Sequence, residues 1–268
     1  MYDIMIVGGG PAGLSAAITA RQHGKDVVVI TNDVTQSGLY KAEIIANYPG
    51  LPGISGKELS DKLTKHAADS GALLLKGQVS SMLAYEGAVN AAFGTEMLES
   101  KTAILATGVV QTSLLPGEEK FLGRGVSYCA TCDGMLFRGR QVCAVCLTPE
   151  AEAEAAYLES IGCAVTRVYE KNLSINGEDK IESITAGGSE ILCEGVFIFR
   201  RAIAPNLLLR GLEIKDGHID TGRNCETTVP GVFAAGDCAG KPYQIAKAAG
   251  EGQVAALSAV DHIAKMEV

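Results

Sequence analysis

Positive charge is scarce in this sequence. Its 268 residues include 23 Lys and Arg against 31 Asp and Glu, which gives a formal net charge of -8 at pH 7. A protein that binds duplex DNA needs many Lys and Arg side chains for phosphate contacts. The charge balance therefore argues against a nucleic acid partner. It does not argue against a protein partner, because protein docking depends on local patches of charge.

Long apolar runs are also missing. No stretch reaches the roughly 18 residues that a membrane-spanning helix needs. The N-terminus begins directly with a strand pattern over residues 3–7, which leaves no room for a signal peptide. We therefore expect a cytoplasmic protein, in a compartment that keeps thiols reduced. Eight cysteines in that setting favour redox or metal chemistry over a framework of structural disulfides.

The chain does contain enough apolar sequence for two domains. Hydrophobic residues make up 47% of the chain, and 268 residues is long for one domain of ordinary size. Residues 2–30 have the pattern of a strand, a glycine-rich turn, a helix and a second strand, and residues 141–169 repeat this order. Composition shifts at residues 111–116 and 204–206 indicate linkers between the two units.

A glycine motif lies between the first predicted strand and helix. Residues 8–13 satisfy GxGxxG, whose glycines allow a tight turn, the approach of a pyrophosphate and close packing of helix on strand. The start of the helix then faces the phosphate charge. One feature differs from the usual pattern, because Thr31 and Asn32 stand where a ribose-binding carboxylate is expected, with Asp33 close by.

Two further pieces of a dinucleotide site lie far along the chain. One is the strand end at residues 106–108, and the other is a short apolar strand that ends in Gly236 and Asp237 just before a helix. An aspartate there suits a hydrogen bond to a ribityl hydroxyl, and glycine allows close approach. The three pieces predict a discontinuous FAD-binding domain over residues 1–111 and 207–268, with residues 112–206 inserted into it.

Cys129 and Cys132 form a CxxC pair within the insertion. Such a pair is close enough to form a labile disulfide with fast thiol exchange, and the adjacent Asp133 is placed to carry a proton. Zinc is the alternative, since Cys143 and Cys146 form a second pair, but alternation along a strand points these two to opposite faces. We interpret Cys143, Cys163, Cys193 and Cys225 as small core or surface residues and leave Cys146 and Cys238 without a role.

These motifs together resemble the low-molecular-weight thioredoxin reductase family. The matching stretches are residues 8–13, 47–50, 106–108, 129–133 and 230–237. The resemblance implies an α/β fold of two Rossmann-like, three-layer ββα domains, of which the second is inserted in the first and reduced in size. It also implies FAD as the cofactor, thioredoxin as the disulfide substrate and a homodimer.

The same resemblance implies a role for each site residue. Cys132 is the flavin-proximal thiol, Cys129 is the interchange thiol that attacks thioredoxin, and Asp133 is the acid/base. Gln244 and its neighbours match the segment that covers the isoalloxazine, and no metal ligands are implied. The expected FAD-binding residues are Gly8, Gly10, Pro11, Ala12, Gly13, Asn47, Val79, Ala106, Thr107, Gly108, Gly236, Asp237, Lys241, Tyr243, Gln244 and Ile245.

The second nucleotide site departs from the family pattern. The family binds NADPH there through a GxGxxA loop and a basic cluster. Residues 145–151 contain no glycine, and residues 169–171 read Tyr-Glu-Lys at the position of the cluster. Glu150, Glu152 and Glu154 place negative charge at the helix start, where it suits the helix dipole but repels a phosphate. We therefore expect that NADPH is not the electron donor.

This pattern resembles the clostridial ferredoxin-dependent flavin thioredoxin reductases, which keep FAD and CxxC but lack the nicotinamide site. Residues 121–129 and 240–257 fit that subgroup. Ferredoxin would then reduce FAD, and the small domain would swing on the two linkers. A conventional NADPH-dependent thioredoxin reductase and a flavin-bearing redox sensor without turnover are the alternatives. Candidates for a basic landing site for ferredoxin are Arg138, Arg140, Arg200, Arg201 and Lys241.

Overall fold

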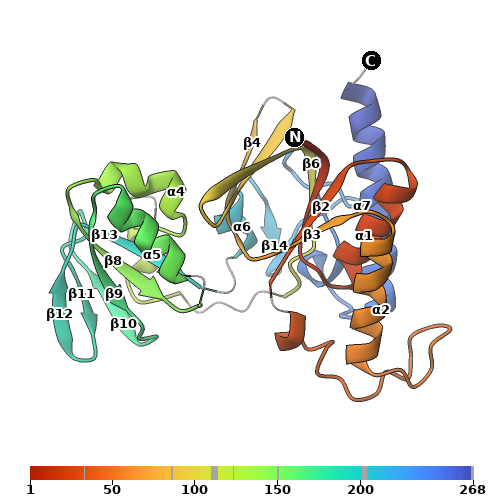
Figure 1. The fold of residues 1–268 in the computed structure, drawn as a ribbon, viewed down its shortest axis with the longest axis horizontal. Helices are drawn as coiled ribbons and strands as arrows, with labels where there is room; N and C mark the ends of the chain where they lie inside the picture. Colours follow the sequence, from red (N-terminus) through yellow and green to blue (C-terminus); the bar gives the residue numbers. More distant parts are fainter. Residues whose placement is uncertain are drawn as a thin grey trace. The chain divides into compact units, whose positions relative to one another are not determined.

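The chain divides into two compact units. The structure is a computed structural model that describes residues 1–32, 34–85, 87–109, 114–122, 124–149, 151–200 and 204–266 (Figure 1). The first unit comprises residues 1–91, 98–110 and 204–268, and the second comprises residues 92–97 and 111–203. The first unit is therefore discontinuous in sequence.

A seven-stranded sheet forms the centre of the first unit. Strand β1 is parallel to β2 and to β6, and β16 is parallel to β6. Residues 4–7 of β1 and 27–30 of β2 are buried without alternation, which is typical of parallel strands covered on both faces. The path runs β3 (Leu73–Lys76), β2 (Val27–Thr31), β1 (Tyr2–Val7), β6 (Glu96–Leu105), β5 (Ala88–Phe93) and β4 (Val79–Tyr85), with β16 (Val232–Ala234) also paired to β6.

Three helices pack together beside this sheet, namely α1 (Pro11–Gln22), α2 (Gly56–Asp69) and α7 (Ile245–Met266) (Figure 1). Small residues bring α1 and α7 close, since a Cβ added to Gly252 would lie 2.1 Å from the Ala12 carbonyl oxygen. The Ser15 hydroxyl also donates to the Ala249 carbonyl at 2.7 Å. Shorter elements of this unit are η1 (Val34–Gln36), α6 (Pro205–Leu208), β14 (Ile214–Lys215), β15 (His218–Ile219) and η3 (Gly236–Ala239).

The second unit has a parallel sheet of its own. Its order is β7 (Val126–Ser127), β13 (Gly195–Phe199), β8 (Gln141–Cys146) and β9 (Ala164–Val168), and α5 (Ala151–Ser160) connects β8 to β9. A second, antiparallel sheet consists of β10 (Leu173–Asn176), β11 (Ser183–Ala186) and β12 (Ser189–Leu192). The short helices are α3 (Glu118–Phe121), α4 (Ala130–Asp133) and η2 (Gly134–Phe137). Both units thus confirm the expected α/β class.

Glycines with positive φ angles separate several neighbouring strands. Strand β3 ends before Gly77, which adopts a φ of 154° and separates β3 from β4. Gly187 and Gly188, with φ values of 56° and 80°, form the turn between β11 and β12. Among the described residues, no helix is both long and apolar enough to cross a bilayer.

Candidate active site

Three of the sequence motifs meet at one edge of the sheet in the first unit. Strand β1 ends directly before Gly8, and β6 ends directly before Ala106. Val7 pairs with Leu105, and Leu105 pairs with Ala234 at the end of β16. Because these strands are parallel, the residues that follow them emerge side by side. The sheet register therefore brings the three predicted pieces of the dinucleotide site together.

The glycines at this edge allow backbone segments to approach closely. Gly8 has a φ of 120°, and a Cβ there would lie 2.1 Å from the Ala106 carbonyl oxygen. A Cβ added to Gly13 would lie 1.9 Å from the Gly8 carbonyl oxygen. At Gly10, by contrast, an added Cβ would meet no atom within 4 Å. The motif thus combines a tightly packed turn with an open side, as a bound pyrophosphate requires.

The start of α1 is suited to an anion. Its N-cap Gly10 forms no side-chain hydrogen bond to the helix, Pro11 occupies the first turn, and that turn contains no acidic residue. The first backbone N–H groups and the positive end of the helix dipole are therefore able to bind a negatively charged group. At the same sheet edge, the Thr107 Oγ1 atom is buried and lies beside the Cys238 thiol. These features fit a phosphate-bearing cofactor.

The end of β2 lacks the expected ribose-binding carboxylate. Thr31 closes this strand, and its hydroxyl donates to the Asn32 carbonyl at 3.1 Å. A Cβ on Gly9 would lie 2.4 Å from Thr31 Oγ1, so the threonine side chain lies against the glycine turn. Asp33 lies outside the described residues. Thr31 is therefore the side chain at this strand end that borders the predicted site.

The turn at Gly236 and Asp237 is held by two residues of α7 that sequence reasoning missed. Glu251 Oε2 accepts a hydrogen bond from the Gly236 N–H at 2.9 Å, and Lys247 Nζ lies 3.0 Å from the same carboxylate oxygen. Lys247 Nζ also donates to the carbonyls of Gly236 and Gly240 at 2.9 and 2.6 Å. Partial burial raises the pKa of Asp237. A Lys–Glu pair four residues apart on a predicted helix is the sequence signal for this contact.

Other predicted cofactor residues are brought together in part. Asn47 Nδ2 donates to Gln244 Oε1 at 2.8 Å, although 197 positions separate these residues. The Tyr243 hydroxyl lies 2.7 Å from His218 Nε2. Val79 is the buried first residue of β4 and lies two positions after Gly77, whose N–H donates to the Thr31 carbonyl at 2.9 Å. Lys241 is exposed, and Ile245 begins α7.

Cys129 and Cys132 are joined by a disulfide, with an S–S distance of 2.01 Å and a Cα–Cα distance of 5.3 Å. Helix α4 begins directly after Cys129, and the Cys132 N–H donates to Cys129 Sγ at 3.1 Å. A hydrogen bond of this kind favours the thiolate after reduction. Cys129 is 2% exposed, whereas Cys132 is exposed. The pair is thus arranged as a redox couple with one sulfur already provided with a donor.

Ser127 connects the disulfide to Asp133. Its hydroxyl donates to Asp133 Oδ2 at 2.7 Å and accepts from the Cys129 N–H at 3.1 Å. The carboxylate of Asp133 is therefore held within the turn that carries both cysteines. Sequence reasoning did not single out Ser127, since a serine at the end of a short strand has no distinctive signature.

The second cysteine pair does not join the first. Val142, Ala144 and Cys146 pack in the core beside α5. Cys143 lies on the opposite face of β8, where its thiol contacts Cys193 and that hydrogen bond lowers its pKa. Within the described part of the chain, no group of three or more His, Cys, Asp or Glu side chains is arranged to hold a metal ion. Cys143, Cys163, Cys193 and Cys225 are all buried, in agreement with the interpretation as core residues, and Cys146 and Cys238 are buried too.

The loop between β8 and α5 differs sharply from the glycine turn of the first unit. The Leu147 N–H donates to the Phe199 carbonyl at 2.9 Å, and the Ala151 N–H donates to the Thr148 carbonyl at 3.2 Å. These two donors are consequently committed within the protein. The buried Cys146 thiol, whose pKa burial raises to about 11, adds a side chain at the start of the loop. In the described part of this loop, the Leu147 and Ala151 N–H groups are therefore not free to bind a pyrophosphate.

The carboxylates expected at the start of α5 are placed in different ways. Glu152 Oε2 accepts from Arg167 Nε at 3.1 Å, and Arg167 also binds Glu159 at 2.5 Å. Glu154 is instead buried at 9% exposure. Glu150 lies outside the described residues. Negative charge at this helix start is therefore partly paired, and one carboxylate is withdrawn from solvent.

Arg200, which follows β13, is not available to a docking protein. Its side chain is 10% exposed and forms an ion pair with the fully buried carboxylate of Glu118. Glu118 also accepts from the Tyr128 hydroxyl at 2.5 Å and from the Leu115 N–H at 2.7 Å. Burial and the Glu118 hydrogen bond raise the pKa of Tyr128. Of the other candidates for a basic landing site, Arg138, Arg140 and Lys241 are exposed, and Arg201 lies outside the described residues.

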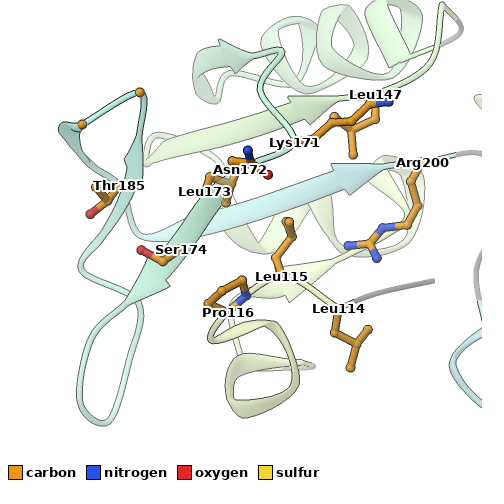
Figure 2. Close-up of a pocket in the computed structure, with 12 residues that line it drawn as sticks. Leu114, Leu115, Pro116, Leu147, Lys171, Asn172, Leu173, Ser174, Thr185 and Arg200 are labelled. Atoms are coloured by element: carbon orange, nitrogen blue, oxygen red, sulfur yellow. The ribbon is translucent and has the colours of Figure 1, made fainter.

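A cavity of about 730 Å³ opens where the strands of the second unit end (Figure 2). Leu147 follows β8, Lys171 lies beyond β9 and Arg200 follows β13, and all three line it. In an α/β unit this strand edge is the usual place for a nucleotide. Much of the remaining wall is apolar, contributed by Leu114, Leu115, Pro116 and Leu173.

Known proteins match almost the whole chain. The sequence profile of the family described as pyridine nucleotide-disulphide oxidoreductase matches residues 2–171 and 151–252. A ferredoxin-flavin thioredoxin reductase from Clostridium acetobutylicum has a crystal structure that is 39% identical, with a TM-score of 0.87 and 98% of each chain covered. The thioredoxin reductase of Treponema pallidum is 31% identical over 98% of this chain and 97% of that protein. The thioredoxin reductase of Bacillus subtilis is 28% identical over 100% and 96%. These matches confirm the resemblance that the motifs indicate.

Proposed function

The chain belongs to the pyridine nucleotide-disulphide oxidoreductase family, and we propose that it is a ferredoxin-dependent flavin thioredoxin reductase. The observation that supports this proposal is the contrast between the turn at residues 8–13 and the loop between β8 and α5. The first has an open side at Gly10 and a helix start free of carboxylates. In the second, backbone donors are used internally and the buried Cys146 side chain stands at the loop start. One dinucleotide, FAD, therefore fits this chain, and NADPH does not.

FAD would be held by the first unit. The turn at residues 8–13 and Thr107 would take the pyrophosphate, and Asp237 would bind a ribityl hydroxyl. Asn47 and Gln244, joined to each other at 2.8 Å, would border the isoalloxazine. A bound flavin supplies the two electrons that reduce the Cys129–Cys132 disulfide.

The turn of residues 129–133, here called the redox turn, then passes the electrons to the substrate. By resemblance to the family, the reduced Cys129 thiolate attacks the disulfide of thioredoxin, although Cys132 is the more exposed residue of the pair in this structure. A mixed disulfide forms as one thioredoxin sulfur leaves and takes a proton. Cys132 attacks Cys129 Sγ, which restores the Cys129–Cys132 disulfide and releases the second thioredoxin sulfur. Asp133, held by Ser127 at 2.7 Å, is the acid/base for these proton transfers.

Ferredoxin is the proposed electron donor because, in the described part of the loop between β8 and α5, the Leu147 and Ala151 N–H groups are bonded within the protein and are not free for a phosphate. The Clostridium acetobutylicum protein, similar over 98% of each chain, is named for ferredoxin, flavin and thioredoxin. Two one-electron transfers would load the flavin before the disulfide is reduced. We also propose that the first unit is the FAD domain, that the second is the redox domain, and that the enzyme is a homodimer.

Steady-state turnover tests this function. The flavin-loaded chain, with thioredoxin and either photoreduced ferredoxin or NADPH, is assayed for thiol release on thioredoxin. Reduction with ferredoxin but not with NADPH is the expected result. Turnover with NADPH would establish the conventional reductase instead. Reversible disulfide reduction without turnover from either donor would favour a redox sensor.

A further inference from the structure

Glu154 in α5 is a buried carboxylate that the mechanism above does not use. It is 9% exposed and accepts a hydrogen bond from the backbone N–H of Ala130, the residue that follows Cys129. Its Oε2 atom is buried and has no hydrogen-bond partner among the described residues. A buried carboxylate with one oxygen unsatisfied is costly when ionised. The structure therefore places a group that readily holds a proton against the redox turn.

Among the described residues, no charged side chain compensates the Glu154 carboxylate. Burial raises its pKa to about 7, the Ala130 hydrogen bond opposes that rise, and no charged side chain in the described part of the chain contributes. Arg167, the cation on the neighbouring strand β9, is bound by Glu152 and Glu159. The other titratable groups on elements packed around α5 are Asp133 of α4, Cys143 and Cys146 of β8, and Cys163 before β9.

We propose that Glu154 is a positioning residue that sets the proton balance of the Cys129–Cys132 couple. This inference rests on the proposed function, because that function assigns the pair as the redox couple. The Glu154 carboxylate and Cys129 Sγ accept hydrogen bonds from two N–H groups of the same turn, those of Ala130 and Cys132. Full negative charge on both acceptors is disfavoured by repulsion. Ionisation of Glu154 and ionisation of the Cys129 thiol are therefore linked.

The linkage appears when the disulfide is reduced. Two electrons break the S–S bond, and two protons complete the dithiol when both sulfurs are protonated. While Glu154 holds its proton, Cys129 can remain a thiolate with the Cys132 N–H as its donor. Once Glu154 is ionised, its negative charge destabilises the Cys129 thiolate, so the reduced pair is less stable relative to the disulfide. The couple therefore becomes more reducing above neutral pH than it would be without this carboxylate.

The test compares the pH dependence of the disulfide potential in wild type and Glu154→Gln. Full-length, flavin-loaded protein is equilibrated with dithiothreitol redox buffers from pH 5.5 to 9, quenched in acid and alkylated after denaturation. Mass spectrometry of the peptide that contains both cysteines then gives the reduced fraction. Glutamine keeps an acceptor for the Ala130 N–H but cannot ionise. The disulfide potential of the variant should equal that of wild type at pH 5.5. By pH 9 the ratio of dithiol to disulfide should be about tenfold higher in the variant, which corresponds to a potential ~30 mV higher for a two-electron couple.

Glu152→Gln is the matched control, since it removes a half-exposed carboxylate from the same helix. It should leave the pH dependence unchanged. Curves for Glu154→Gln that run parallel to wild type across the whole range would overturn the proposal, because a purely structural role predicts only a constant offset.

A second measurement uses the wild type alone, in case Glu154→Gln does not fold. Infrared difference spectra near pH 7.5, with ¹³C-labelled glutamate, should show a glutamic acid gaining a proton when the disulfide is reduced. No labelled carboxyl signal would refute the linkage. Dithiothreitol replaces the natural donor in these measurements, so their result is independent of whether ferredoxin, NADPH or thioredoxin reacts with this protein.

Discussion

Glu154 also predicts how the stability of this protein depends on pH. Burial raises its pKa from 4.5 to about 7. The folded state therefore binds this proton more tightly than the unfolded state does. The resulting stabilisation is fully present below about pH 4.5 and is lost as the pH rises through about 7. At 1.36 kcal/mol per pKa unit, the complete loss is roughly 3 kcal/mol, of which about 2.5 kcal/mol falls between pH 5 and pH 8.5.

Substitution of Glu154 by glutamine removes this titration while keeping an acceptor for Ala130. The difference in free energy of unfolding between Glu154→Gln and wild type should therefore move by about 2.5 kcal/mol in favour of the variant between pH 5 and pH 8.5. Because the chain has no tryptophan, urea unfolding is followed by circular dichroism. Glu152→Gln serves as the control for the loss of one negative charge. A difference that stays constant with pH to within about 0.5 kcal/mol would refute the reasoning.

Three further substitutions test separate parts of the account. Cys129→Ser should abolish thioredoxin reduction while the flavin absorbance of the purified protein is unchanged, and residual turnover would exclude this thiol as the interchange residue. Gly252→Ala places a Cβ 2.1 Å from a carbonyl oxygen of α1. It should therefore lower the free energy of unfolding by about 1–3 kcal/mol, measured by thermal unfolding, and lower the amount of flavin retained. The control Gly250→Ala, whose Cβ would meet no atom within 4 Å, should change neither quantity. Glu118→Ala leaves the buried guanidinium of Arg200 uncompensated and should destabilise by about 3–5 kcal/mol in urea unfolding, and a loss below about 1 kcal/mol would contradict this assignment.

The meeting of the glycine-rich segments in the first unit could be predicted from the sequence because each segment has its own signature. Residues 8–13 carry GxGxxG, and Gly236 and Asp237 follow a short apolar strand. Parallel pairing of β1, β6 and β16 then brings these pieces to one edge. The parallel α/β architecture thus follows from the alternation of strand and helix patterns along the chain.

The buried polar contacts could not be predicted from the sequence. Glu118 and Arg200 are 82 positions apart, and each resembles an ordinary surface charge until the fold brings them together. Glu154 stands in a run of alternating glutamates, where its neighbour Glu152 is half exposed and Glu154 itself is buried. Helical periodicity assigns a face to each residue, but the backbone N–H that meets that face belongs to the distant redox turn. Such contacts depend on tertiary packing rather than on local pattern.

Anaerobic flavin spectra test the central claim most directly. The oxidised, flavin-loaded protein is mixed with excess NADPH in one cuvette and with reduced ferredoxin in another, and the flavin absorbance is followed with time. If ferredoxin is the electron donor, it should bleach the flavin, and NADPH should leave the flavin oxidised. Rapid bleaching by NADPH would contradict this claim, because the loop between β8 and α5 would then accommodate a pyridine nucleotide after all.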